Sequence, residues 1–106
     1  MNTEENESVN ASAVNAMMRS IESYRRGDVH LPQLVNALQS ALHGMLNVPH
    51  EWRARFLQSW AALEEINALA LDAGQPRLPE DHEKIVSRAL ETIQQLIAQA
   101  ASSFAR

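Results

Sequence analysis

Four histidines are the side chains of this chain best suited to binding a metal ion or exchanging a proton near neutral pH. A zinc site needs three or four ligands that converge, and a His-Glu-x-x-His pair on one helix is a common signature of one. No such pair occurs, and the helix-breaking segment 47–49 separates His43 from His50. His30, His50 and His82 fall near expected helix starts or loops, where exposed polar residues are common. The sequence therefore predicts no bound metal ion.

Paired carboxylates are the second candidate for chemistry, as a general acid and base. Glu64 and Glu65 are adjacent on an expected helix, so their side chains point about 100° apart and cannot face each other. No Glu-x-x-His pair, nucleophile elbow or Gly-rich phosphate loop is present. The chain has no cysteine, which excludes thiolate catalysis, Cys-based zinc sites and disulfides. We therefore expect a protein without enzymatic activity and without a cofactor.

Helices must position these side chains, because good helix formers dominate and only three glycines and four prolines interrupt the chain. Apolar residues at helical spacing predict helices over about 13–26, 32–45, 49–73 and 79–100, bounded by proline starts and glycine stops. Short connections favour antiparallel neighbours. The prediction is an all-α, single-domain antiparallel bundle of about four helices, with a long central third helix in contact with all the others.

The polar and acidic residues 1–11 lack helical periodicity, and we expect a flexible N-terminal arm there. The bundle domain is expected over residues 12–106, with Ser12 as a plausible cap of the first helix.

The third helix carries both tryptophans. Trp52, Phe56 and Trp60 recur every four residues, and Leu63 continues the same side of the helix. The stripe is expected to continue through Ile66, Leu69, Ala70 and Leu71. A stripe of this kind favours core packing, because aromatic side chains bury a large apolar area. The other interpretation is an exposed aromatic anchor at a protein interface.

The charge balance is acidic, with nine Lys+Arg against thirteen Asp+Glu and a net charge of −4. This is a poor profile for a nucleic-acid-binding protein, which needs a basic patch. No segment approaches the ~20 apolar residues of a membrane span, and the first residues do not resemble a signal peptide. We expect a cytoplasmic protein that contacts neither nucleic acid nor a membrane.

Charges along the third helix oppose its dipole, with Arg53 and Arg55 near its start and carboxylates toward its end. In an antiparallel bundle that end adjoins the start of the fourth helix, so six carboxylates should gather there. They are Glu64, Glu65, Asp72, Glu80, Asp81 and Glu83. One interpretation is a solvated surface with local ion pairs, involving Asp28, Arg25, Arg26 and Arg77 nearby. The other is an acidic docking surface that attracts a cationic partner.

Several segments between Tyr24 and Ile97 carry a family resemblance. They are Tyr24–Val35, Trp52-Arg53 with Phe56, Trp60–Glu65 and Ala70–Asp72. Over about two thirds of its length, the chain resembles small all-helical immunity proteins of bacterial contact-dependent growth-inhibition systems. The resemblance implies a cytosolic protein that binds its cognate toxin and blocks the toxin's active site. We expect a monomer rather than a homodimer. Many such toxins are nucleases with basic clefts, so the expected partner is a basic nuclease domain, most simply a ribonuclease.

The six carboxylates are then the expected contact set for the toxin. A family of this kind has no catalytic residues to carry over. The alternative function is a structural or regulatory helical adaptor that binds a partner helix, or that forms a homodimer burying part of the aromatic stripe.

Overall fold

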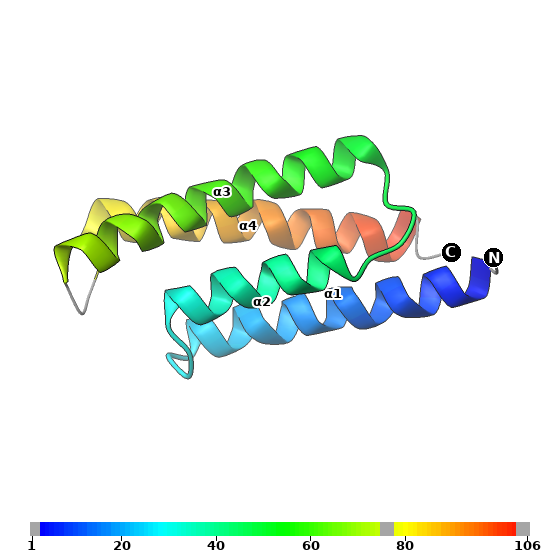
Figure 1. Ribbon diagram of the computed structural model, residues 1–106, viewed down its shortest axis with the longest axis horizontal. Coiled ribbons are helices and arrows are strands. Elements are labelled where there is room, and N and C mark those ends of the chain that lie inside the picture. Colours follow the sequence, from blue (N-terminus) through cyan, green and yellow to red (C-terminus); the bar gives the residue numbers. More distant parts are fainter. Residues whose placement is uncertain (1–2, 75–77, 104–106) are drawn as a thin grey trace.

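Four α-helices make up the protein in a computed structural model that describes residues 3–74 and 78–103, and the side chains of residues 9–74 and 78–100. They are α1 (Thr3–Arg25), α2 (Leu31–His43), α3 (His50–Ala73) and α4 (Glu80–Ser103). Successive helices run in opposite directions and form one elongated bundle (Figure 1). The described residues contain no β-strand. The predicted all-α antiparallel four-helix bundle is confirmed.

Each helix packs against two neighbours around the bundle. α1 contacts α2 and α4, and α3 contacts the same two helices, so α1 and α3 lie diagonally across the core. The expectation that α3 touches every other helix is therefore wrong. In a bundle with a four-sided cross-section, diagonal helices are separated by the core side chains between them.

Proline and glycine set the ends of α3. The carbonyl of Pro49 accepts a hydrogen bond from the backbone N–H of Arg53 at 3.0 Å, so Pro49 lies just before the first helical residue. Gly74 ends the helix in the left-handed conformation with φ of 63°, which costs glycine little because it has no Cβ. The expected stop signal is confirmed.

The N-terminal segment differs from the expected arm over residues 1–11, because α1 already begins at Thr3. Buried Asn10 lies in this extended helix. Its side chain donates to the carbonyl of Leu46 and accepts from the N–H of Leu46, both at 2.8 Å. An amide that satisfies both backbone groups of one loop residue fixes the α2–α3 connection against α1. Sequence periodicity could not show this long-range pairing.

The core lies between all four helices. Its largest fully buried side chains come from every helix: Met17, Ile21, Leu34, Leu38, Leu42, Phe56, Leu63, Leu90 and Ile93. Burial of such side chains stabilises a fold by roughly 1.5–3 kcal/mol each before the loss of conformational entropy is counted.

The aromatic stripe of α3 belongs to this core, as predicted. Trp52 is 5% exposed and Phe56 fully buried, with ring centroids 5.4 Å apart. The indole N–H of Trp52 donates to the carbonyl of Leu96 in α4 at 2.8 Å, and that of Trp60 to the carbonyl of Val35 in α2 at 2.9 Å. Residues eight apart on a helix point about 80° apart, so the two indoles reach different neighbours. Together they fix the orientation of α3.

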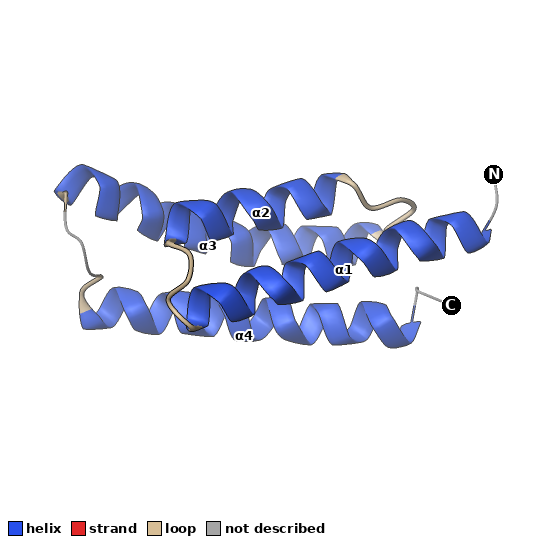
Figure 2. Ribbon diagram, turned by 90° about the horizontal axis from the view of Figure 1, so that it is seen from below, coloured by secondary structure: helices blue, strands red, loops and turns tan. Residues whose placement is uncertain are grey.

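Unequal helix lengths leave one end of the bundle stepped. α2 has 13 residues and α3 has 24. Because Trp60 lies beside Val35 and the helices are antiparallel, the start of α2 is level with about residue 64 of α3. The α3–α4 hairpin therefore projects beyond the α1–α2 connection, as both views show (Figures 1 and 2).

Candidate functional site

The solvent-facing side of α3 is unusually apolar for a surface helix, which normally presents polar residues to water. Leu57 is 38% exposed and Leu71 64% exposed, although both lie on a helix whose other side fills the core. Ala61 and Ala68 are also exposed on this side. We call the surface formed by these four apolar residues and three carboxylates among them the outer face of α3. Its residues are Leu57, Ala61, Glu64, Glu65, Ala68, Leu71 and Asp72.

Helix geometry explains why these positions share one side. Residues 57, 61, 64, 68 and 71 alternate in steps of four and three, the spacing that forms a continuous row along a helix. They lie on the side opposite or flanking that of Phe56 and Leu63. Beyond about residue 64 of α3, α2 does not cover the row, because α2 begins at that level and runs toward the other end of the bundle. This overhang accounts for the high exposure of Leu71.

The structure places three of the predicted carboxylates on the outer face of α3. Glu64, Glu65 and Asp72 are all exposed there. Glu65 and Asp72 are seven residues apart and so point within about 20° of each other. A cationic surface could contact both of them together with Leu71.

The other three predicted carboxylates lie in the first turn of α4 and are also exposed: Glu80, Asp81 and Glu83. They lie at the same end of the α3–α4 hairpin as Asp72, on the other helix of that hairpin. Glu83 is near enough to Tyr24 of α1 for its charge to act on the Tyr24 hydroxyl. Burial raises the pKa of the Tyr24 hydroxyl, and the charge of Glu83 raises that pKa further. The six exposed carboxylates are therefore divided between two helices, three on α3 and three on α4.

Local ion pairs neutralise part of the charge at this end of the molecule. Nζ of Lys84 lies 4.0 Å from the carboxylate of Glu80 one turn away, and Nε of Arg26 lies 3.2 Å from that of Asp28. All four side chains are exposed, so each pair contributes little to stability. Arg77 lies outside the described residues. Within the described part of the chain, the three carboxylates of the α3 outer face have no ion-pair partner closer than 4.0 Å.

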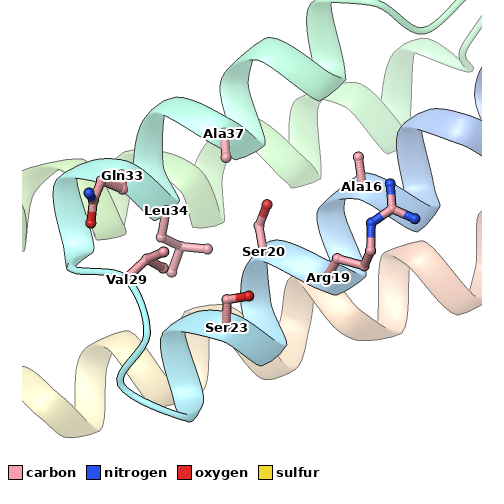
Figure 3. A pocket seen from close by; sticks show the side chains of 8 residues that line it. All are labelled: Ala16, Arg19, Ser20, Ser23, Val29, Gln33, Leu34 and Ala37. Carbon is pink, nitrogen blue, oxygen red and sulfur yellow. The ribbon is translucent and has the colours of Figure 1, made fainter.

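The shallow grooves between neighbouring helices include three that are lined by described residues. The first, of about 560 Å³, separates α1 from α2 and is lined by small side chains such as Ala16, Ser20 and Ala37, with Arg19 at its edge (Figure 3). Two further hollows of about 490 and 430 Å³ meet at Gln58, Ser59 and Thr92 on the α3–α4 surface. No carboxylate or histidine lines any of these three grooves. None of them holds the paired proton donor and acceptor that acid–base catalysis needs.

The histidines do not converge. His30, His43 and His50 are exposed, and His82 is half-buried with a buried Nδ1 that has no hydrogen-bond partner among the described residues. In the same part of the chain, no three His, Asp or Glu side chains come together in a way that could hold a metal ion. None of the described helices combines the length and the apolar character needed to cross a bilayer.

Sequence reasoning found the carboxylates of this candidate site but missed its apolar residues. Spacing placed Leu71 on the aromatic stripe, because it is eleven residues from Trp60 and points within about 20° of it. The expected burial of Leu71 and Leu69 is wrong, since they are 64% and 47% exposed. A scan against protein-family models and searches of curated proteins and of solved structures gave no match for this chain.

Proposed function

We propose that this chain is an immunity protein that binds a cognate contact-dependent growth-inhibition toxin in the cytoplasm and occludes its active site. The single observation that carries the proposal is the outer face of α3, where three carboxylates lie exposed beside exposed Leu57 and Leu71. The resemblance of the segments between Tyr24 and Ile97 to such immunity proteins supports the same function.

The chemistry of this face fits a cationic protein partner. Exposed apolar side chains that line up on one surface mark protein interfaces, because their burial on binding releases ordered water. Carboxylates around them select partners of opposite charge and speed the encounter. A ribonuclease needs a basic cleft to bind the phosphate backbone. An acidic and partly apolar face that covers such a cleft would exclude RNA from it.

The contacts that hold α3 in the bundle favour tight binding of a partner to its outer face. The indole hydrogen bonds from Trp52 to Leu96 and from Trp60 to Val35 hold the helix against both of its neighbours. A face presented by a rigid helix loses little conformational freedom when a partner binds, so more of the contact energy appears as affinity.

A homodimer through the aromatic stripe is disfavoured, because little of the stripe is exposed to a second copy. Trp52 and Phe56 are already buried within the single chain, and Trp60 packs partly buried against the same core. At the outer face of α3, a second copy would bring like charges together. Leu69 and Ile85 are also exposed, at 47% and 45%, but they lie outside that face. A monomer that binds a basic partner is the simpler proposal.

Co-purification with the toxin domain encoded by the adjacent gene tests the function. We expect a one-to-one complex that abolishes the ribonuclease activity of the toxin domain in an RNA-cleavage assay. Leu71→Ser should speed dissociation, and Asp72→Lys should slow association in a salt-dependent way. The matched control is Glu91→Lys, the same type of charge reversal at an exposed position of α4 away from the α3 outer face.

The proposal fails if the two proteins form no complex at low salt, or if the complex cleaves RNA at the rate of the free toxin. It also fails if Glu91→Lys weakens binding as much as Asp72→Lys, because binding would then follow net charge alone.

A further inference from the structure

We propose that the binding partner presents a cationic amphipathic helix that packs lengthwise along the outer face of α3. This inference rests on the proposed function for the choice of binding face, and it specifies the secondary structure and charge of what covers that face. It is carried by the spacing of the exposed residues, the size of the alanines among them and the position of Glu64.

The spacing matches the requirements of helix-on-helix packing. The row formed by residues 57, 61, 64, 68 and 71 repeats in steps of four and three, the pattern with which helices pack at a small crossing angle. From Leu57 to Leu71 the row is about 21 Å long at 1.5 Å per residue. A second helix carries side chains at the same repeat and can stay in register over four turns, whereas an extended strand, with about 3.3 Å per residue, cannot.

Alanine leaves space along the row. Ala61 and Ala68 are exposed and alternate with the longer side chains of Leu57, Glu64 and Leu71. Each alanine creates a gap into which a side chain of the partner helix can insert. The interaxial distance between helices depends on the residues at the contact, and small residues allow its lower limit of about 8 Å. The row is therefore shaped to accept the side chains of another helix.

The charge of the row determines which helix it accepts. Glu64 lies at the centre of the row, and Glu65 and Asp72 flank it. Burying Glu64 against an apolar helix would leave an unpaired charge away from water, which is costly. A Lys or Arg at the central position of the partner helix removes that cost. Additional cations along one flank of that helix would pair with Glu65 and Asp72.

The same charge disfavours a second copy of this chain as the occupant. In a two-fold antiparallel pairing centred on the row, Glu64 would lie against Glu64 of the other copy. In a parallel pairing, Glu64 of each copy would again face its equivalent. Like charges brought together in an interface reduce affinity. The partner helix must therefore belong to a different, cationic protein.

The probe that tests this proposal is a synthetic helical peptide of three heptads labelled with fluorescein. It has Leu at the positions that face Ala61 and Ala68, Ala at the positions that face Leu57 and Leu71, and one Lys at the centre of its apolar face. A second peptide carries Glu in place of the central Lys, and a third carries a central Pro that breaks the helix. Fluorescence anisotropy measures affinity, and circular dichroism measures the helicity gained on binding.

We expect the Lys peptide to bind the wild-type protein saturably and to gain helicity. The Glu peptide should bind roughly tenfold more weakly, a difference of about 1.4 kcal/mol, and the Pro peptide should not bind detectably. Ala61→Arg, which fills a gap in the row, should abolish binding of the Lys peptide. The matched control is Gln95→Arg, which places the same side chain at an exposed position of α4.

A charge exchange gives the sharpest result. The Glu64→Lys variant should no longer bind the Lys peptide and should bind the Glu peptide instead, because this exchange restores a pair of opposite charges at the centre of the interface. Failure of the Lys peptide to bind, equal binding of the Pro peptide, or the same effect from Gln95→Arg as from Ala61→Arg would each overturn the proposal.

The two proposals fail in distinguishable ways. If the toxin complex forms but Ala61→Arg and Glu64→Lys leave it unchanged, the helix proposal is wrong and the immunity function stands. If the peptide results hold while the adjacent toxin does not bind, the immunity function is wrong and the α3 outer face remains a helix-binding surface.

Discussion

The inner and outer faces of α3 show how one helix can carry two interfaces. Phe56 is fully buried and its chain neighbour Leu57 is 38% exposed, because successive residues on a helix point about 100° apart. The inner face holds bulky aromatic residues with satisfied indole N–H groups. The outer face holds small or aliphatic residues interspersed with carboxylates. The inner face fixes the helix in the bundle, and the outer face remains available.

The largest difference in stability is expected between truncation of Phe56 and truncation of its chain neighbour Leu57. Phe56→Ala leaves a cavity in the core and should lower the free energy of unfolding by about 3–5 kcal/mol. Leu57→Ala should lower it by only about 1 kcal/mol, because that side chain is 38% exposed and its removal leaves no enclosed cavity. Urea unfolding measures both. Equal losses would mean that the outer face is packed within the monomer.

The two tryptophans test how firmly the inner face holds the helix. Trp52→Phe removes the N–H that donates to the Leu96 carbonyl and shrinks a buried side chain, so we expect a loss of about 1–3 kcal/mol. Trp60→Phe should cost less, about 1 kcal/mol, because its hydrogen bond to Val35 is only partly buried. Thermal unfolding of both variants gives the order. A larger loss at Trp60 would contradict the assignment of Trp52 to the better-packed contact.

Removing the central charge should turn the outer face into an interface for a second copy. Glu64→Leu makes all five positions of the row apolar, and we expect concentration-dependent self-association in sedimentation velocity. The monomer should change in stability by less than about 0.5 kcal/mol. Glu91→Leu adds the same side chain at an exposed position of α4 and should stay monomeric. A monomeric Glu64→Leu protein would show that the row lacks the shape for helix packing.

The smallest expected effect concerns Tyr24, the single tyrosine, beside the acidic start of α4. Its pKa is higher in the folded than in the unfolded protein, so the folded state holds the phenolic proton more tightly. Stability should be unaffected below the unfolded value near 10.0 and should fall as the pH rises through it toward the folded value.

Urea unfolding on either side of that pH measures the effect. Tyr24→Phe should remove this alkaline loss, and Glu83→Gln should reduce it, because burial is the larger cause and the charge of Glu83 the smaller one. An unchanged alkaline loss in Tyr24→Phe would show that another group is responsible.

Sequence patterns predicted the helices better than their contacts. The proline and glycine punctuation located α2, α3 and α4 closely, because these residues act on the backbone of their own neighbours. The start of α1 at Thr3 was missed. The segment before Ser12 has no apolar periodicity, and its buried contact is made by the amide of Asn10 with Leu46 across the bundle. A contact over that distance in the chain leaves no local pattern.

The candidate site was predicted in part for a similar reason. Local spacing is enough to place Glu65 and Asp72 on one side of α3, and both lie there. Spacing alone does not show that α2 begins level with about residue 64 of α3 and does not extend beside Leu71, which is therefore 64% exposed. It also does not show that the charge of Glu83 acts on Tyr24 of α1.

The sequence by itself determined an acidic chain of four amphipathic helices and a core that includes Trp52 and Phe56, since periodicity and punctuation act within one helix. The tertiary structure alone decided which helices are neighbours, that the two indoles reach different helices, and that the outer face of α3 stays uncovered. The physical reason is that exposure depends on where other helices end. A leucine on a helix is buried or free according to what lies beside it, and only the assembled bundle supplies that.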